Sequence, residues 1–145
     1  MTNRIRLKSM LRKHEGVKSH AYKCTSGQWT IGVGRNIDDR TGIGLSDHEI
    51  DYMLENDINR TEAELERAFP WFSTLSETRK DVIIDICFNI GLTKLRKFKK
   101  ALDAMENKDY NQAAIDFLDS RWARQVKKRA NRLCDMLIAD SYDVD

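Results

Sequence analysis

The sequence predicts a mainly helical α+β protein, with a small lobe that holds a short antiparallel sheet and with helices over the rest of the chain. Two observations lead to this fold class. Over residues 28–34, large apolar side chains alternate with small or polar ones, which is the period of a strand. From residue 46 onward, apolar residues instead recur every three or four positions, which is the period of a helix packed on one side.

The first predicted elements are a short helix and a hairpin. Residues 7–14 show the spacing of one helix face, and Gly16 follows as a stop signal. Residues 21–34 then form a hairpin around a turn at 25–27. From residue 35 to 45 the chain is rich in Gly, Asp and Asn, so we expect a loop or a ragged strand there.

A long helix is predicted next, from Ser46 to about Phe69. Ser46 and Glu49 match a capping box, in which the Ser hydroxyl accepts from the third helical N–H and the Glu carboxylate reaches back. The helical period continues without a break as far as Pro70. Such a length suits a strut between two lobes.

Beyond the long helix, every predicted element is helical. Ser76 caps a helix that ends near Gly91, and the apolar spacing marks a further helix at 98–105. The stretch Asp109–Gln112 matches a second capping box, and a final helix carries the apolar residues of 133–138.

Composition excludes several classes of protein. The chain has 145 residues, 33% of them charged and 41% hydrophobic, enough for one compact domain or two small lobes and unlike a disordered tail. No run approaches the roughly 18 consecutive apolar residues of a membrane span. The basic N-terminal stretch lacks the apolar core of a signal peptide. We therefore expect nothing that anchors or exports the protein.

Cysteines and histidines form no disulfide or metal-ligand pattern. The chain has three of each, with no Cys-x-x-Cys spacing: Cys24, Cys87, Cys134, His14, His20 and His48. We expect Cys87 and Cys134 to be core thiols, and we expect no metal or cofactor.

Charge is unevenly distributed although the net charge is only +2. Residues 46–67 hold eight acidic residues against two arginines, whereas 94–100 and 121–132 are strongly basic. Basic stretches of this kind attract a polyanion such as nucleic acid, anionic lipid or cell wall, or they keep a helix face solvated.

Three residues around the predicted hairpin form a candidate catalytic group. Glu15 ends the first helix, Cys24 follows the first strand, and Thr30 lies in the second. A helix end beside a hairpin can direct an acid, a thiol and a hydroxyl into one cleft, because alternate strand residues share a face.

The residues around this group closely resemble the lysozymes of T-even-type bacteriophages, which are phage endolysins of glycoside hydrolase family twenty-four. The resemblance covers nearly the whole chain and rests on Glu15–Gly16, Tyr22–Cys24, Thr30–Gly34, Phe88–Gly91, Ser120–Trp122, Gln125, Arg129–Ala130 and Arg132. It implies a lysozyme-like two-lobed α+β fold in a single domain. Residues 14–58 are then the sheet-containing lobe and 59–145 the helical lobe, which residues 1–13 join.

The same resemblance implies the activity, which is cleavage of peptidoglycan between N-acetylmuramic acid and N-acetylglucosamine without metal or cofactor. Glu15 matches the general acid and Thr30 the residue that holds the hydrolytic water. Cys24 stands where the family usually has Asp. A thiol has an ordinary pKa of about 8.5, and its thiolate can act as a base toward water or as a nucleophile on the sugar.

Further roles carry over by position. Arg129 matches an arginine that pairs with the catalytic Glu and orients it. The sugar-contact positions of the family fall on Asn36, Phe88, Ala101 and Asp116, of which Phe88 alone matches in identity.

The resemblance also implies partners and location. We expect a monomer that acts on bacterial peptidoglycan and binds no nucleic acid. It should wait in the host cytoplasm until a membrane lesion, such as a phage holin supplies, opens the way to the periplasm and wall. Two alternatives use other features: a helical nucleic-acid-binding protein based on the basic stretches, and an inactive wall-binding module, since the usual Asp is missing.

Overall fold

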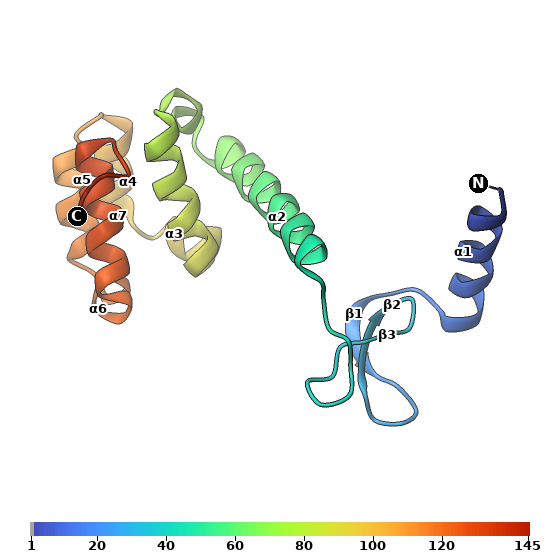
Figure 1. The fold of residues 1–145 in the computed structure, drawn as a ribbon. Coiled ribbons are helices and arrows are strands. Elements are labelled where there is room, and N and C mark those ends of the chain that lie inside the picture. The colour runs from blue at the N-terminus through green and yellow to red at the C-terminus, as the bar shows by residue number, and fades with distance from the viewer. Residues whose placement is uncertain (1) are drawn as a thin grey trace. The chain divides into compact units, whose positions relative to one another are not determined.

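The computed structural model describes residues 2–145 and divides into two compact units, with the boundary between Met53 and Leu54. The first unit holds helix α1, a three-stranded sheet and the start of α2, and the second holds the remaining helices (Figure 1). The elements are α1 (Thr2–Glu15), β1 (Lys18–Lys23), β2 (Trp29–Gly32), β3 (Arg35–Asn36), α2 (Asp47–Ala68), the 3-10 helix η1 (Pro70–Thr74), α3 (Glu77–Leu95), α4 (Lys99–Glu106), α5 (Tyr110–Leu118), α6 (Arg121–Val126) and α7 (Lys128–Ala139). The mainly helical α+β fold class is confirmed.

The sheet is antiparallel, in the order β1-β2-β3. Thr30, in the central strand, lies opposite Tyr22 of β1 and opposite Asn36 of β3. The pairing of β1 with β2 is irregular between Lys18 and Tyr22. The third strand falls in the stretch where the sequence allowed a loop or a ragged strand, and it is only two residues long.

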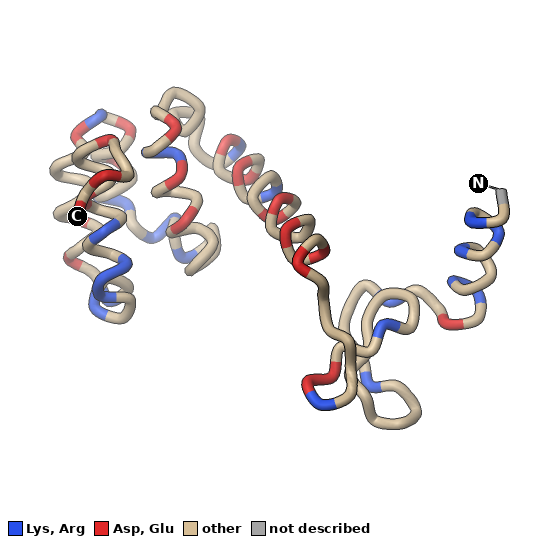
Figure 2. Tube along the Cα trace, in the orientation of Figure 1, with Lys and Arg blue, Asp and Glu red and all other residues tan. Residues whose placement is uncertain are grey.

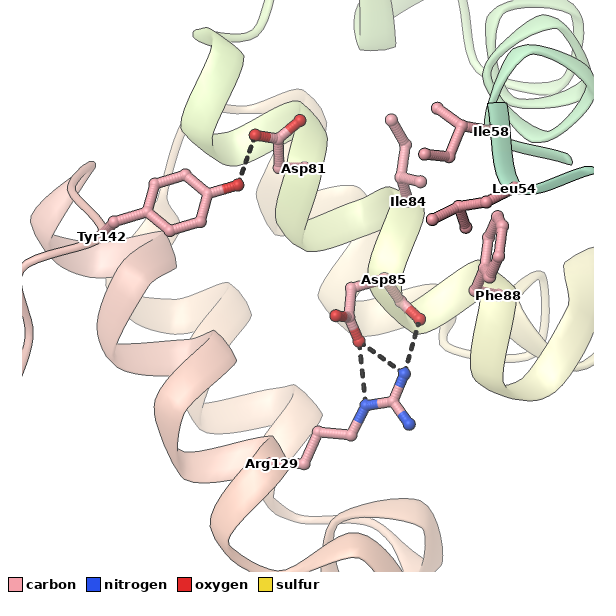
Figure 3. A pocket seen from close by; sticks show the side chains of 8 residues that line it. All are labelled: Leu54, Ile58, Asp81, Ile84, Asp85, Phe88, Arg129 and Tyr142. Atoms are coloured by element: carbon pink, nitrogen blue, oxygen red, sulfur yellow. Dashed lines mark hydrogen bonds and ion pairs between the residues drawn. The ribbon is translucent and has the colours of Figure 1, made fainter. Parts of the chain in front are cut away.

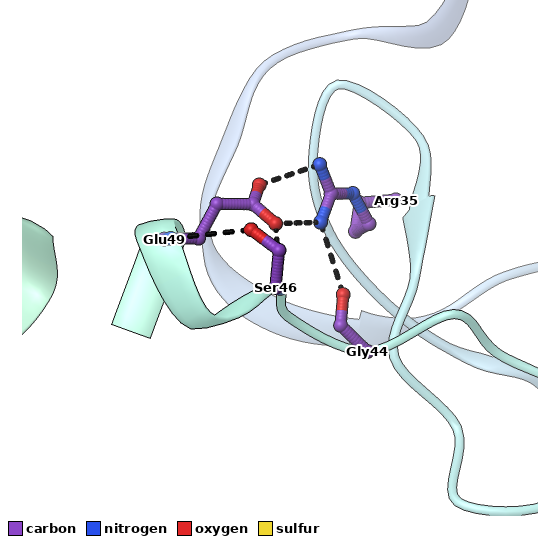
Figure 4. A network of polar contacts seen from close by, with 4 residues as sticks. All are labelled: Arg35, Gly44, Ser46 and Glu49. Atoms are coloured by element: carbon purple, nitrogen blue, oxygen red, sulfur yellow. Dashed lines mark hydrogen bonds and ion pairs between the residues drawn. The ribbon is translucent and has the colours of Figure 1, made fainter. Parts of the chain in front are cut away.

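The start of α2 is fixed to the sheet by the predicted capping box and an ion pair (Figure 4). The Ser46 N–H donates to Glu49 Oε1 at 2.8 Å, and the Glu49 N–H donates to Ser46 Oγ at 3.2 Å, which confirms the box. Arg35 of β3 donates to Glu49 Oε1 at 2.8 Å and lies 2.6 Å from Oε2. A further bond joins Arg35 to the Gly44 carbonyl at 2.9 Å. The hydrogen bond from Arg35 and then that from the Ser46 backbone lower the pKa of Glu49 to about 2.

The second unit has a continuous apolar core built from α2 through α7. Its largest fully buried side chains are Leu65, Phe72, Ile83, Ile86, Leu95, Met105, Phe117 and Leu137. Trp122 is buried beside Phe98 and Phe117, and its indole N–H donates to Asn89 Oδ1 at 2.7 Å. Buried aromatic rings with a satisfied polar atom stabilise the packing of α4, α5 and α6.

Two predicted helix starts have different outcomes. Ser76 caps α3 as expected, since its hydroxyl accepts from the Arg79 N–H at 3.3 Å. The second capping box is only half formed: Asp109 accepts from the Gln112 N–H at 3.1 Å, but the Gln112 amide donates to Asp116 instead of reaching back. The physical reason is that the Asp109 N–H already donates to the Ala104 carbonyl at 2.8 Å.

The acidic and basic stretches of the sequence lie on different helices. Figure 2 shows acidic residues along α2 and basic residues through α6 and the first part of α7. Two of the basic side chains are paired inside the second unit, Arg129 with Asp85 and Arg132 with Asp145. Within residues 2–145, no helix combines the length and apolar character that a membrane crossing requires.

Candidate active site

Glu15 is the last residue of α1, and its carboxylate lies against the turn between β2 and β3. The helix ends because Gly16 adopts φ +80, a left-handed conformation that favours glycine, while its N–H still donates to the Arg12 carbonyl at 2.9 Å. At Gly34, a Cβ atom would lie 2.5 Å from Glu15 Oε2. Glycine at position 34 therefore leaves the space that the carboxylate occupies.

Cys24 and Thr30 are held together by the β1–β2 turn. The Cys24 N–H donates to the Gln28 carbonyl at 2.9 Å, and the Thr30 hydroxyl donates to the same carbonyl at 2.9 Å. Thr30 is only 5% exposed, the one buried polar residue among those the structure describes. Because its proton is engaged, the Thr30 oxygen can accept a hydrogen bond from a water molecule.

The pKa of the Cys24 thiol is lower than the ordinary value. Backbone hydrogen bonds from Gln28 and then Ser26 are the main causes, because they stabilise the thiolate. Cys87 and Cys134 are buried core thiols as predicted, and burial raises the pKa of Cys134 to about 12. Cys24 is thus the thiol best suited to form a thiolate.

Asn36 faces Thr30 across the sheet, but both ends of its amide are engaged. Its Nδ2 donates to the Thr41 hydroxyl at 3.2 Å, and its Oδ1 accepts from the Asp38 N–H at 2.9 Å. The side chain therefore shapes the loop after β3.

The other predicted site residues lie in the second unit, where Phe88 and Arg129 line one pocket of about 380 Å³ (Figure 3). Arg129 lies 2.8 Å from Asp85 Oδ1 through Nη2, and its Nε donates to the same oxygen at 2.9 Å. Tyr142 donates to Asp81 at 2.5 Å on the pocket wall, and this bond raises the pKa of Tyr142 to about 12.

Ala101 and Asp116 line a second pocket, of about 500 Å³, in the same unit. Three lysines lie on its rim at the N-terminal end of α4: Lys97, Lys99 and Lys100. Ala101 itself is buried, so the polar groups of this pocket come from Asp116, Asp119, Ser120 and the three lysines.

The predicted site residues thus fall into two sets. In the first unit, Thr30 and Asn36 lie in the sheet, Cys24 lies in the turn before β2, and Glu15 lies against Gly34. The second unit holds Phe88, Ala101, Asp116 and Arg129. Sequence reasoning missed Gly34 and Asp85 as neighbours of Glu15 and Arg129. For Asp85, the sequence did hold a signal. This acidic residue lies four positions after Asp81, on the same face of a helix that is otherwise largely apolar.

Comparison with known proteins decides the family. The model of the phage lysozyme family matches residues 12–135, a range that contains every predicted site residue. The chain belongs to the phage lysozyme family. As a phage lysozyme it is a glycoside hydrolase, a muramidase, and its substrate is peptidoglycan.

Relatives of this phage lysozyme cover most of its length. Probable T4-type lysozyme 2 of Dictyostelium discoideum is 31% identical, in an alignment that covers 88% of this chain and 90% of the relative. Probable T4-type lysozyme 1 of the same organism is 30% identical, with 90% of this chain and 92% of the relative covered. An endolysin of Acyrthosiphon pisum secondary endosymbiont phage 1 is 26% identical, with 79% of this chain and 75% of the relative covered.

Proposed function

We propose that this chain is a phage endolysin that hydrolyses the β-1,4 bond between N-acetylmuramic acid and N-acetylglucosamine and so lyses the bacterial host. The observation that supports the proposal is that the Glu15 carboxylate lies against the turn after β2, the strand that contains Thr30 and that follows the Cys24 turn. Hydrolysis of a glycoside requires an acid that protonates the leaving oxygen and a group that activates water, and Glu15 beside Cys24 and Thr30 can supply them.

Glu15 acts first, as the general acid. It transfers its proton to the glycosidic oxygen while the bond between that oxygen and the anomeric carbon breaks, so that the leaving sugar departs as an alcohol. The carboxylate lies against Gly34, which limits where the acid can move relative to the sheet. A fixed acid lowers the barrier because little reorientation is needed at the moment of reaction.

Cys24 and Thr30 act on the water that attacks the anomeric carbon. The water donates one hydrogen bond to the Thr30 oxygen, whose own proton is engaged with Gln28, and gives its other proton to the Cys24 thiolate. The lowered pKa of Cys24 supports this role, since more thiolate is present near neutral pH. At the end of the cycle Glu15 is a carboxylate and Cys24 a thiol, and a proton passes through solvent to restore both.

This water route inverts the anomeric configuration. Direct attack of the Cys24 sulfur on the sugar would instead form a covalent glycosyl intermediate and retain it. We favour the water route because the free acceptor capacity of Thr30 beside Cys24 provides a place for the water.

Substrate contacts are proposed at Asn36, Phe88, Ala101 and Asp116. The last two line one pocket with a lysine rim, which supports a site for the anionic peptide-bearing part of the glycan. Arg129 uses Nε and Nη2 on Asp85, so Nη1 is left for a second carboxylate. We propose that this second carboxylate is Glu15, which Arg129 would orient.

In the cell, the protein is proposed to act as a monomer without a nucleic-acid partner. It would remain in the host cytoplasm until a holin opens the membrane, and then reach the wall. The basic residues of α6 and α7 would attract the anionic wall polymer rather than nucleic acid.

The direct test is clearing of Gram-negative cells whose outer membrane has been permeabilised. Purified wild-type protein should clear the suspension, whereas Glu15→Gln, which keeps the shape and removes the proton, should be slower by roughly 100-fold or more. Near-native clearing by a folded Glu15→Gln variant would exclude Glu15 as the acid. A salt-sensitive shift of duplex DNA without clearing would favour the nucleic-acid alternative.

A further inference from the structure

A pocket of about 430 Å³ opens between the β1–β2 turn and the loop after β3. We call it the hairpin pocket, and its lining includes Lys23, Gln28, Trp29, Asp39, Arg40 and Thr41. None of their side chains has a role in the proposed cleavage, in which Gln28 takes part through its backbone carbonyl alone.

The hairpin pocket lies on the other side of the sheet from Thr30. Trp29 and Thr30 are consecutive residues of β2, and consecutive strand residues point to opposite faces. Their exposures agree with this geometry, because Thr30 is 5% exposed and Trp29 is 46% exposed. A ligand on Trp29 would therefore be separate from the water site of Cys24 and Thr30.

The walls of the hairpin pocket are held in place before any ligand binds. The Trp29 N–H donates to Asp38 Oδ2 at 3.3 Å, and the Ile37 N–H donates to the Trp29 carbonyl at 2.8 Å. The Thr41 hydroxyl donates to the side-chain oxygen of Gln28, which joins the loop to the turn. A preorganised pocket binds with little ordering cost.

Several polar groups of the pocket have no use inside the protein. Within residues 2–145, the side chains of Lys23, Asp39 and Arg40 make no hydrogen bond or ion pair. The Lys23 ammonium lies 5.3 Å from the centroid of the Trp29 ring, which places a positive charge beside the exposed indole. The pocket thus combines one flat aromatic surface with two cations and one carboxylate that make no hydrogen bond or ion pair with any residue that the structure describes.

We propose that the hairpin pocket is a second glycan-binding site, which takes an N-acetylated amino sugar of a peptidoglycan strand. The indole of Trp29 would stack on the apolar face of the sugar ring, because an exposed aromatic ring provides rigid contact area with a polar edge. Asp39 would bind hydroxyl or amide groups. Lys23 and Arg40 would bind carboxylates of the stem peptide. This inference rests on the proposed function, and the site would keep the enzyme on the insoluble wall between cleavages.

Binding to purified sacculi tests the site in the Glu15→Gln protein, which should bind without cleaving. Adding Trp29→Ala should weaken co-sedimentation roughly tenfold, as expected for loss of a central aromatic contact. The matched control is Tyr52→Ala, since Tyr52 is an exposed aromatic residue of α2 outside the pocket, with 70% exposure. Equal affinity of the Trp29→Ala and Tyr52→Ala proteins would overturn the proposal.

A second measurement needs no substitution at Trp29. In nitrogen-15 spectra of the Glu15→Gln protein, a soluble N-acetylglucosamine oligomer should shift the indole N–H signal of Trp29, and an unmoved signal at saturating sugar would refute the site. The clearing assay separates the two proposals. A protein that clears cells but shows no Trp29 effect lacks the second site only, whereas a protein that does not clear but shows the Trp29 shift binds glycan at this pocket and lacks the proposed activity.

Discussion

Gly34 shows how a position without a side chain supports the proposed general acid. A Cβ atom at Gly34 would lie only 2.5 Å from Glu15 Oε2, so a side chain there would compete with the carboxylate for space. The backbone angle φ at Gly34 is +68. Gly34→Ala should displace the flexible carboxylate and lower kcat roughly tenfold or more, because small misplacements of a reacting group are costly. The measurement is the initial rate of clearing.

Gly32→Ala is the matched control for Gly34→Ala. Gly32 has nearly the same backbone angle, φ +69, but a Cβ there meets nothing within 4 Å. Both variants should lose a similar amount of stability, about 1 kcal/mol, from backbone strain. An equal loss of kcat in the two would show that the contact with Glu15 does not matter.

The pH profile of the reaction should report the Cys24 thiol. The thiolate form increases with pH, and the lowered pKa of Cys24 places the rising limb of activity below the ordinary range of a thiol. Cys24→Asp should keep activity and move this limb to lower pH by several units, because a carboxyl group ionises near pH 4. Cys24→Ala should lose about 100-fold in rate.

Alkylation offers an independent measurement of the same role. Cys24 is partly exposed, whereas Cys87 and Cys134 are buried with raised pKa values, so a thiol reagent should modify Cys24 selectively. If wild type, the alkylated enzyme and Cys24→Ala were equally active, another group would have to activate the water.

Glu15, Cys24 and Thr30 could be predicted from the sequence because the residues around them resemble the phage lysozymes, and their catalytic roles stay predictions. Nothing in the sequence indicated that the Asn36 side chain would bind within the loop after β3, where Asp38 and Thr41 engage both ends of its amide. Such contacts depend on the path of the chain after β3, which no local pattern specifies.

At the scale of elements, the start of α2 depends on the Arg35–Glu49 pair. The pKa of Glu49 is lowered to about 2, so its stabilising charge is fully present above the ordinary range near 4.3 and is lost as the pH falls through about 2. Glu49→Gln should therefore lower stability at neutral pH, and the difference from wild type should vanish near pH 2. Urea unfolding between pH 2 and 7 measures this.

Asp51→Asn is the control for Glu49→Gln, since Asp51 is an exposed acid of the same helix with no ion pair within residues 2–145. Its effect on stability should be small and should not follow the pH dependence of Glu49→Gln. A pH-independent effect of Glu49→Gln would mean that the ion pair does not stabilise the helix start.

Helix starts with a Ser or Asp cap were predictable, because Ser46, Ser76 and Asp109 each accept the expected backbone bond. The break between α6 and α7 was not. It falls at Lys127, which has φ 51 and ψ −107. No Gly or Pro marks this position, so the basic stretch gives no local signal that the helix must change direction.

At the scale of the whole molecule, the α+β class followed from a change of period, from two along β2 to three or four from α2 onward. The lobe bounds at 14–58 and 59–145 stay predictions. The structure itself divides inside α2, which gives its first turns to one unit and the rest to the other.

Cell lysis should require an opened membrane. Expression of the protein in the bacterial cytoplasm should spare the cells, and membrane disruption should then cause rapid lysis by wild type but not by Glu15→Gln. Culture turbidity measures both. Lysis without disruption, which persists when secretion is blocked and is absent in Glu15→Gln, would mean that the protein crosses the membrane unaided.

Muramidase cleavage by Glu15 is measured most directly by the identity of the sugar at the new reducing ends after digestion of purified sacculi. Borohydride reduction and mass spectrometry of the released fragments distinguish the two amino sugars. We expect reducing N-acetylmuramic acid ends from wild type and almost none from Glu15→Gln. Reducing N-acetylglucosamine ends, or equal release by the two proteins, would contradict it.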